Sequence, residues 1–318
     1  MLDFADIEAA AKRLDGVAHR TPVLTSRALD SATGARLFLK AENFQRTGSF
    51  KFRGAFNAIA SLAPEQRKHI VTGSSGNHGQ AIALSASLFD APCTVVMPTD
   101  APEVKKTAVR GYGGFIVEYD RMTGDRVAVS AQVAEDTGGI VVPPYDHHPV
   151  MAGQGTAAVE LIDEVGQLDV LLVCTGGGGL LAGCSTAAKH LSPDAEVWGV
   201  EPEASDDTQQ SLAAGRVITI DQPVTIADGQ ALRAPGDLTF AVNSRLVAGV
   251  TTVTDAQIVD AMRFAFDRLR IVLEPSGASA LAAALAGNVE ITGRKVGITL
   301  SGGNVDRARF AQLLTDGI

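Results

Sequence analysis

Residues 47–55 read TGSFKFRGA and place Lys51 in a small-residue turn, beside an aromatic residue and at the start of an apolar helical run. Burying an ammonium group is costly, so most lysines lie in solvated surroundings. A lysine held in an apolar pocket has a lowered pKa and can act as a nucleophilic amine that forms Schiff bases. For this stretch alone, a surface lysine at a helix start is the commoner case, but the rest of the chain favours the nucleophile.

The composition describes a globular chain with a mildly acidic surface. Its 318 residues are 46% hydrophobic and 20% charged, with a net charge of −9, enough for one large or two moderate domains. The charge argues against nucleic acid or an anionic membrane as the main partner. No apolar run reaches the length of a transmembrane helix, and the acidic start of the chain does not resemble a signal peptide.

Cysteine usage points to a reducing compartment. Cys93, Cys174 and Cys184 are odd in number and form no CxxC pair. The pattern argues against a disulfide framework and a structural zinc site, and we expect a cytoplasmic protein.

Strands and helices alternate through the middle of the chain. We expect strands at 70–73, 93–98, 115–118 and 140–142, with helices at 80–89, 103–110 and 125–136. Such alternation implies right-handed crossovers and a parallel sheet. Ahead of this part, we expect a helix at 6–15, a hairpin-like turn at Gly34, a strand at 37–40 and a helix from Lys51 to about residue 62.

A second α/β unit follows a junction at residues 143–149. We expect strands at 170–174, 197–200 and 295–300, helices at 157–165, 180–190, 255–269 and 278–286, and a loop-rich part at 202–236. The predicted fold class is α/β, with two open twisted, mainly parallel sheets flanked by helices. One unit spans 65–146, and the other combines 1–64 with 147–318. Ligands of such sheets bind at the carboxyl ends of strands.

Four consecutive glycines, Gly176 to Gly179, follow a buried strand and precede a helix. Glycines let the backbone approach an anion, which the free N–H groups and the helix dipole then hold. A compact single phosphate fits this loop. A loose dinucleotide fingerprint, with Glu201 as the ribose ligand, keeps an NAD-binding oxidoreductase open as an alternative. A tight structural turn is a third explanation, although a turn rarely needs four glycines.

Two other polar loops follow predicted strands. Residues 74–79, SSGNHG, suit a carboxylate at a helix N-terminus, whereas Ser74 as an N-cap and His78 as a buried structural histidine are the alternatives. In residues 301–304, SGGN, Ser301 suits either a ring nitrogen deep in a cleft or an ordinary loop position. Residues 201–207 contain four carboxylates, which suit Mg²⁺ or Ca²⁺ but also a solvated acidic loop.

The lysine turn, SSGNHG, the tetraglycine and SGGN occur in the order that resembles the fold type II pyridoxal-phosphate enzymes, in particular serine/threonine dehydratases and serine racemase. The resemblance covers nearly the whole chain. It implies a large cofactor-binding domain, 1–64 plus 147–318, and a small substrate-binding domain, 65–146. It also implies a homodimer, because family members commonly form one.

By this resemblance, Lys51 would hold pyridoxal phosphate and, in its free form, remove the substrate's α-proton. Phe50 would lie against the cofactor ring, Asn77 would contact its 3′-oxygen and Ser301 its ring nitrogen. The phosphate would be bound by Gly176, Gly177, Gly178, Gly179 and Leu180. The substrate carboxylate would be held by Ser74, Ser75, Asn77 and His78.

Three further roles come from the resemblance. Ser75 would face Lys51 as a second acid/base, as in serine racemases, where many threonine dehydratases have alanine. Glu201, the carbonyl of Ser205 and Asp207 would bind a divalent cation (Mg²⁺, Mn²⁺ or Ca²⁺). Arg126 would accept a second substrate carboxylate, as in 3-hydroxyaspartate, with a solvated helix arginine as its alternative.

The predicted function is therefore that of a pyridoxal-phosphate-dependent ammonia-lyase. It would eliminate the β-hydroxyl of L-threonine or L-serine to give a 2-oxo acid and ammonia, with serine racemase activity as a side reaction. Dehydration of 3-hydroxyaspartate or another β-hydroxy amino acid, or racemisation as the main activity, is the alternative. A nicotinamide-dependent oxidoreductase and a non-catalytic ligand-binding protein represent other classes.

Overall fold

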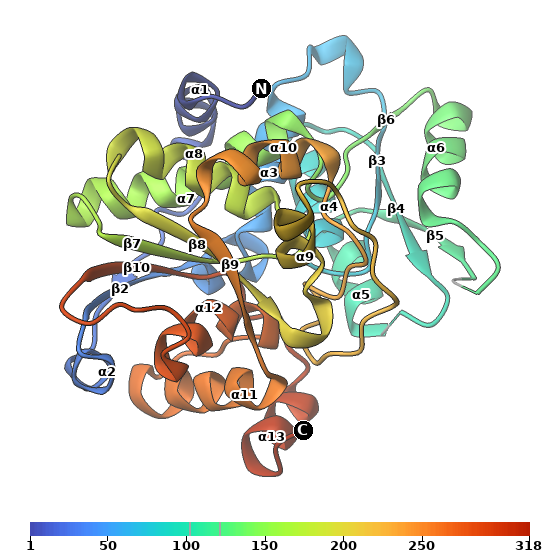
Figure 1. Ribbon diagram of the computed structural model, residues 1–318. Helices are drawn as coiled ribbons and strands as arrows, with labels where there is room; N and C mark the ends of the chain where they lie inside the picture. The colour runs from blue at the N-terminus through green and yellow to red at the C-terminus, as the bar shows by residue number, and fades with distance from the viewer. Residues whose placement is uncertain (102, 121) are drawn as a thin grey trace.

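The computed structural model describes residues 1–101, 103–120 and 122–318, and it contains two open sheets (Figure 1). The four-stranded sheet has the order β5-β4-β3-β6, and all its pairs are parallel. The six-stranded sheet has the order β1-β2-β10-β7-β8-β9, in which β1 pairs antiparallel with β2 and the other pairs are parallel. The predicted fold class is confirmed.

The strands of the four-stranded sheet are β3 (Ile70–Gly73), β4 (Cys93–Pro98), β5 (Phe115–Tyr119) and β6 (Ile140–Val141). Those of the six-stranded sheet are β1 (Val23–Leu24), β2 (Arg36–Ala41), β7 (Val170–Cys174), β8 (Glu196–Pro202), β9 (Gly249–Val253) and β10 (Lys295–Leu300). Every residue of β4 and β7 is buried, because helices cover both faces of these parallel sheets.

The helices in the N-terminal half are α1 (Phe4–Leu14), α2 (Arg27–Thr33), α3 (Lys51–Ala60), α4 (Asn77–Ser87), α5 (Glu103–Gly111), α6 (Arg126–Thr137) and α7 (His148–Val165). The later helices are α8 (Gly179–Leu191), α9 (Asp207–Ala214), α10 (Asp237–Leu246), α11 (Asp255–Phe264), α12 (Pro275–Ala286) and α13 (Arg307–Thr315). Figure 1 shows α5 and α6 beside the four-stranded sheet, and α11, α12 and α13 together below the six-stranded sheet.

Several elements differ from the sequence predictions. Gly34 does not form a hairpin turn: it adopts a left-handed conformation at the C-terminus of α2, a helix that the sequence pattern did not reveal. Helix α7 begins at His148 rather than residue 157, because Pro149 occupies a first-turn position where no N–H is needed. The α-helix predicted to reach residue 269 ends at Phe264, and residues 265–269 form a π-helical turn.

The part of the chain predicted to be loop-rich contains α9, and the chain after it adds three elements that were not predicted, α10, β9 and α13. Contacts with neighbouring elements decide these elements as much as their local sequence pattern does. Helix α9 carries Asp207 in its first turn, where a carboxylate complements the helix dipole.

The Lys51 turn is joined to the end of β10. Ser49 and Gly302 form an isolated antiparallel bridge, the N–H of Phe50 donates to the carbonyl of Ser301 at 3.0 Å, and the N–H of Gly303 donates to Gly48 at 2.9 Å. The turn therefore faces the carboxyl end of the six-stranded sheet. Helix α3 behind it packs against α4 and α7. The division into two domains at residues 64 and 147 stays a prediction.

A buried ion cluster lies on the other side of this turn. The Arg53 guanidinium bonds Glu42 at 2.7 Å and Glu160 at 2.6 Å, and the ammonium of Lys40 bonds Glu160 at 2.7 Å. Arg53, Glu42 and Lys40 are fully buried. Because removing one partner would leave an uncompensated buried charge, this cluster links β2, α3 and α7 firmly.

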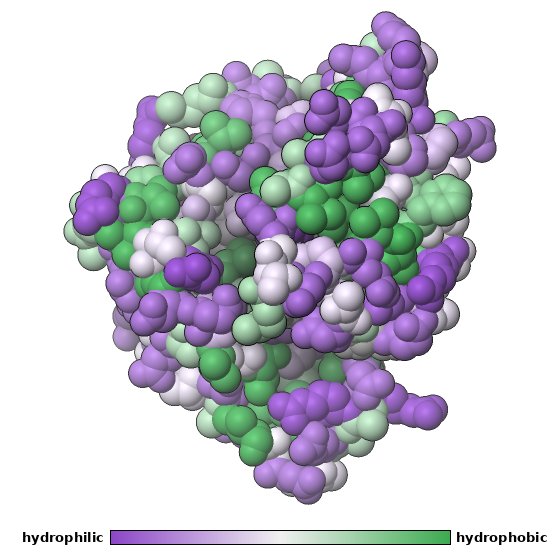
Figure 2. All heavy atoms as spheres, turned by 90° about the vertical axis from the view of Figure 1, so that its right-hand side faces the viewer, coloured by the Kyte–Doolittle hydropathy of each residue, from purple (hydrophilic) through white to green (hydrophobic). Residues whose placement is uncertain are grey.

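Exposed apolar side chains gather on the outer side of the four-stranded sheet. Phe115 and Val117 of β5 and Val127 of α6 are exposed, and Figure 2 shows apolar side chains together on the face that looks out from this side. Among the described residues, no helix has the length and apolar character to cross a membrane. Cys93, Cys174 and Cys184 are buried and form no disulfide.

Candidate active site

A cavity of about 500 Å³ opens at the carboxyl ends of β3, β7 and β10. This is where open α/β sheets bind ligands. The cavity contains every residue predicted to contact cofactor or substrate. These residues are Phe50, Lys51, Ser74, Ser75, Asn77, His78, Arg126, Gly176, Gly177, Gly178, Gly179, Leu180 and Ser301.

The ammonium of Lys51 lies at the inner wall of this cavity. Its Nζ donates to the carbonyl of Pro144 at 2.8 Å and lies 5.0 Å from the centre of the Phe50 ring. Burial lowers the pKa of Lys51 to about 8, although Cys174 and Glu274 act in the opposite direction. A lysine with this pKa has a sizeable free-amine fraction near neutral pH, as a nucleophile or general base requires. The side chain thus lies within a cavity and not on the open surface of the protein.

The glycine loop packs too closely to accept side chains. A Cβ at Gly177 would lie 2.3 Å from the Tyr145 ring, and Gly178 has a φ of +87°. The carbonyl of Gly177 accepts a hydrogen bond from the Thr239 hydroxyl at 2.7 Å, and that of Gly178 accepts one from Asn243 at 3.2 Å.

The N–H groups of this loop remain available. Within the described residues, the backbone N–H groups of Gly176, Gly177 and Gly178 donate to no acceptor. They precede the positive end of α8, so the loop forms a cradle for an anion. This arrangement fits the phosphate of pyridoxal phosphate.

The loop from Ser74 to His78 lies on the opposite side of the cavity, at the N-terminus of α4. The Ser74 hydroxyl accepts a hydrogen bond from the N–H of Gly76 at 3.3 Å. Within the described residues, the backbone N–H groups of Ser75, Asn77 and His78 have no acceptor. This helix N-terminus is suited to bind a carboxylate.

The His78 ring is less suited to that task than its backbone. The side chain is buried, and Nε2 lies 3.1 Å from the carbonyl of Val142, so Nε2 carries the proton and Nδ1 offers only a lone pair. Burial, together with the nearby Lys51, lowers the pKa of His78 to about 3. The ring is therefore neutral and has no N–H left for a substrate carboxylate.

Asn77 is held between two side chains. Its Nδ2 donates to Glu274 at 2.6 Å, and its Oδ1 accepts from Asn304 at 2.8 Å. Burial and the charge of Asp228 raise the pKa of Glu274 to about 8. The sequence prediction missed Glu274, which precedes Pro275 at the start of α12 and there resembles an ordinary helix cap.

Ser301 lies deep in the cavity and is 3% exposed. Its hydroxyl is 3.5 Å from the carbonyl of Ser276. Tyr145 and Cys174 also line the cavity and were not among the predicted contact residues. The junction position of Tyr145 was a sequence signal, because a segment between two units commonly borders their cleft.

Two cations from helices beside the four-stranded sheet, one in α5 and one in α6, line the cavity, and they differ in their partners. Lys105 forms an ion pair with Asp228 at 2.6 Å. Arg126, at the start of α6, has no acidic partner among the residues that the structure describes. Its side chain crosses Gly73, where a Cβ would lie 2.7 Å from the Arg126 Cγ, so glycine is required at the end of β3.

The predicted metal residues lie outside this cavity. Both oxygens of Glu201 accept backbone hydrogen bonds from α9, from Thr208 at 3.2 Å and Gln209 at 3.1 Å. Burial and the neighbouring Asp207 raise the pKa of Glu201 well above its usual range. Among the described residues, no three His, Cys, Asp or Glu side chains form a metal-binding group, so a cation here would depend on two carboxylates and backbone oxygen.

The position of Glu201 also excludes its role in the nicotinamide alternative. The residue is fully buried, and its oxygens bond the N-terminus of α9. It is therefore not available to a ribose hydroxyl group.

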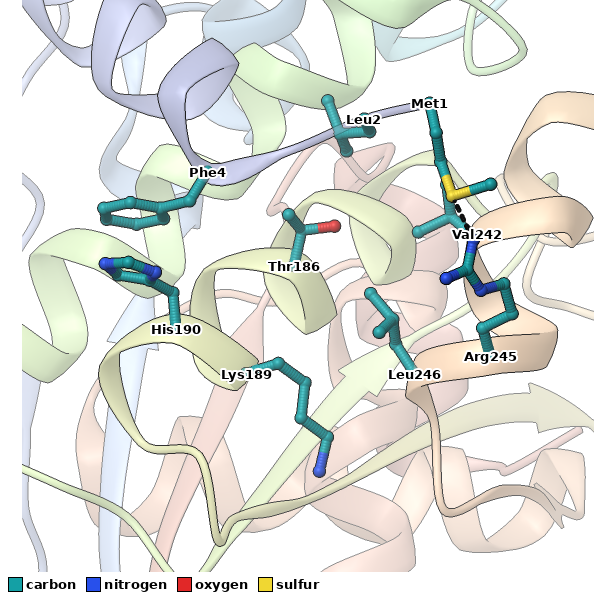
Figure 3. A pocket seen from close by; sticks show the side chains of 9 residues that line it. All are labelled: Met1, Leu2, Phe4, Thr186, Lys189, His190, Val242, Arg245 and Leu246. Carbon is teal, nitrogen blue, oxygen red and sulfur yellow. Dashed lines mark hydrogen bonds between the residues drawn. The ribbon is translucent and has the colours of Figure 1, made fainter.

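A second cavity, of about 280 Å³, lies between the N-terminus, α8 and α10 (Figure 3). The Phe4 ring stacks on His190 with centroids 3.9 Å apart, and Arg245 contacts the sulfur of Met1. Its remaining lining is mostly aliphatic. The larger cavity is therefore the candidate active site.

Two open, mainly parallel sheets, a lysine of lowered pKa at their shared cleft and a glycine cradle for phosphate define the fold type II class of pyridoxal-phosphate enzymes. Residues 14–302 match the family model described as "Pyridoxal-phosphate dependent enzyme". The chain belongs to this family, within its serine/threonine dehydratase and serine racemase branch. Pyridoxal phosphate, and not NAD, is its cofactor.

Full-length similarity connects the chain to proteins of two named activities. It is 49% identical to L-threo-3-hydroxyaspartate ammonia-lyase of Saccharomyces cerevisiae over 313 residues, covering 98% of this chain and 96% of the relative. It is 47% identical to serine racemase of Schizosaccharomyces pombe, covering 98% and 97%. The structure of maize serine racemase superposes with a TM-score of 0.94 at 41% identity, covering 99% and 97%. The homodimer stays a prediction.

Proposed function

We propose that this enzyme converts a β-hydroxy amino acid with a second carboxylate, 3-hydroxyaspartate, into a 2-oxo acid and ammonia. The observation that carries this proposal is Arg126, a guanidinium that lines the cavity without an acidic partner among the described residues. A guanidinium can bind a carboxylate through two parallel N–H···O bonds. Serine and threonine, the substrates predicted first, would leave this group unpaired. Similarity to L-threo-3-hydroxyaspartate ammonia-lyase supports the same substrate class.

The proposed reaction divides the work between the two sides of the cavity. The free N–H groups of Ser75, Asn77 and His78 would bind the α-carboxylate, while Arg126 binds the distal one. Pyridoxal phosphate, once bound, supplies an electron sink for the charge that develops at the α-carbon. The Nζ of Lys51, held by the carbonyl of Pro144, would take the α-proton.

The test compares substrates in wild-type, Arg126→Gln and Arg126→Lys proteins. We expect Arg126→Gln to lower kcat/KM for 3-hydroxyaspartate by about 100-fold, the size of a lost hydrogen bond between charged groups, while kcat/KM for serine changes less than about threefold. Arg126→Lys keeps the charge but loses the planar guanidinium that forms two parallel hydrogen bonds. Its kcat/KM for 3-hydroxyaspartate should therefore lie between those of wild type and Arg126→Gln. Arg110→Gln, an exposed arginine of α5, is the control. Equal losses for both substrates would reject the proposed role of Arg126.

Racemisation is a second candidate activity, and Ser75 favours it. Ser75 lines the same cavity as Lys51, and its hydroxyl makes no hydrogen bond within the described residues. A hydroxyl that returns a proton to the opposite face of the α-carbon would give the D-amino acid. Ser75→Ala should then lose D-serine formation from L-serine while 2-oxo acid formation persists, with Ser87→Ala as the control. Parallel loss of both products would contradict this assignment.

We also propose a divalent cation (Mg²⁺, Mn²⁺ or Ca²⁺) held by Glu201, the carbonyl of Ser205 and Asp207. Asp207 is buried beside Glu201, and its Oδ2 has no hydrogen-bond partner among the described residues. Two buried carboxylates in proximity repel each other unless a cation or a proton compensates their charge. The oxygen-rich donor set suits these hard cations.

A further inference from the structure

Glu274 lies in the active-site cavity, yet the proposed reaction gives it no task. We infer that Glu274 and Asn304 together fix the orientation of the Asn77 side-chain amide, so that Glu274 is a positioning residue for the cofactor. The inference rests on the proposed contact between Asn77 and the 3′-oxygen of pyridoxal phosphate.

The hydrogen bonds of Asn77 define one orientation of its amide. Oδ1 accepts from the Nδ2 of Asn304, which can only donate, and Nδ2 donates to Oε1 of Glu274. A flipped amide would place the Nδ2 groups of Asn77 and Asn304 together, and two N–H donors cannot bond each other. Nδ2 has a second N–H, and this remains free for an oxygen in the cavity.

Both holders of Asn77 are themselves fixed. The N–H of Glu274 donates to the carbonyl of Gly302 at 3.1 Å, and a Cβ at Gly302 would lie 2.0 Å from Oε1 of Glu274, so glycine is needed for the carboxyl to lie there. Asn304 also donates to the carbonyl of Thr47 at 2.6 Å. The same chain of bonds thus connects α4, the start of α12 and the Lys51 turn.

The charges around Glu274 indicate which form of its carboxyl group acts. Lys51 and Lys105 favour the carboxylate, whereas burial and Asp228 favour the neutral acid, and together they raise the pKa of Glu274 to about 8. At neutral pH most of the carboxyl groups are therefore protonated, and the carbonyl oxygen accepts from Asn77. Glutamine has the same shape and offers the same acceptor. Glu274→Gln should therefore preserve the orientation of Asn77, and Glu274→Ala should lose it.

The test measures how fast pyridoxal phosphate leaves the holoenzyme, from the decay of its visible absorbance while a phosphatase removes the free cofactor. We expect cofactor loss about tenfold faster in Glu274→Ala, the size of one lost hydrogen bond, and within about twofold of wild type in Glu274→Gln. In the Asn77→Ala background, Glu274→Ala should no longer speed cofactor loss, because a positioning residue acts through its partner. Glu164→Gln, an exposed acid of α7, is the control.

The double-mutant comparison separates positioning from general destabilisation. The inference is overturned if Glu274→Ala speeds cofactor loss equally in the wild-type and Asn77→Ala backgrounds, or if it does not change the rate at all. If Glu274→Ala does not fold, Asn304→Ala removes the other holder of the same amide and must give the same Asn77-dependent loss. A wild-type protein that binds pyridoxal phosphate but does not turn over 3-hydroxyaspartate contradicts the proposed function and leaves this inference standing.

Discussion

The two sides of the active-site cavity are built differently. The side from the six-stranded sheet is buried and fixed by backbone contacts: Ser301 and Glu274 are 3% and 5% exposed, and the glycine loop touches Tyr145. The side from the four-stranded sheet carries half-exposed polar residues, with Lys105 and Arg126 at its outer part. The contrast suggests that a rigid side holds the cofactor common to the family, while a more open side distinguishes substrates.

The largest expected effect separates the two cavity lysines. Lys51→Ala should lower turnover by about 10⁴-fold, because it removes both the cofactor attachment and the general base. Lys105→Ala should keep turnover within about tenfold, because Lys105 is paired with Asp228 and takes no part in the proposed chemistry. The measurement is 2-oxo acid formation, together with the mass added to the intact protein after borohydride reduction. Cofactor mass retained in Lys51→Ala would refute the assigned attachment.

Paired glycine substitutions test the rigidity of the two sides. A Cβ at Gly177 would meet the Tyr145 ring at 2.3 Å, so Gly177→Ala should lower the free energy of unfolding by up to about 3 kcal/mol and weaken cofactor binding. A Cβ at Gly76 would meet nothing within 4 Å beyond its chain neighbours, so Gly76→Ala should lower the free energy of unfolding only by about 1 kcal/mol, because alanine is a poorer N-cap of α4 than glycine. Chemical denaturation with and without added pyridoxal phosphate measures both. Similar losses of free energy of unfolding in the two variants would mean that the two sides of the cavity are equally tightly packed.

The cation site tests whether the rigid side extends beyond the cavity. Mg²⁺ at 100 times its Kd should raise the free energy of unfolding of wild-type protein by about 2.7 kcal/mol relative to EDTA. Asp207→Ala should lose this increase, whereas Asp206→Asn, at the adjacent residue, should keep it. In EDTA, Asp207→Ala should have a higher free energy of unfolding than wild-type protein, because removing Asp207 relieves its repulsion of Glu201. An unchanged Mg²⁺ response in Asp207→Ala would contradict the proposed ligands.

The sequence predicted the buried apolar strands better than the elements and residues whose place depends on contacts far along the chain. Strand β7 was predicted because it is a continuous apolar run, and β3, β4 and β10 because they are rich in β-branched and other apolar residues. The loops after β3, β7 and β10 were placed at the cleft because they follow the carboxyl ends of these strands. Glu274 could not be found this way, because its role depends on Asn77, 197 residues away. Likewise, α10 was missed although Thr239 and Asn243 hold the glycine loop.

The smallest expected effect concerns His78, a fully buried side chain on the more open side. With a pKa of about 3 in the native state against an ordinary 6.5, this ring stays neutral in the folded protein while it gains a proton in the unfolded chain. Below pH 6.5 the unfolded chain therefore binds more protons, and the stability falls as the pH decreases toward 3. Between pH 7 and 5 this contribution amounts to about 2 kcal/mol of lost free energy of unfolding. His78→Gln keeps a donor for the Val142 carbonyl but cannot titrate, so its free energy of unfolding should fall by about 2 kcal/mol less over the same interval.

His190→Gln, at an exposed position of α8, is the control and should retain the wild-type dependence of the free energy of unfolding on pH. Parallel slopes for wild type and His78→Gln, measured by denaturation at each pH, would mean that the ring is solvated and that both sides of the cavity are open to water.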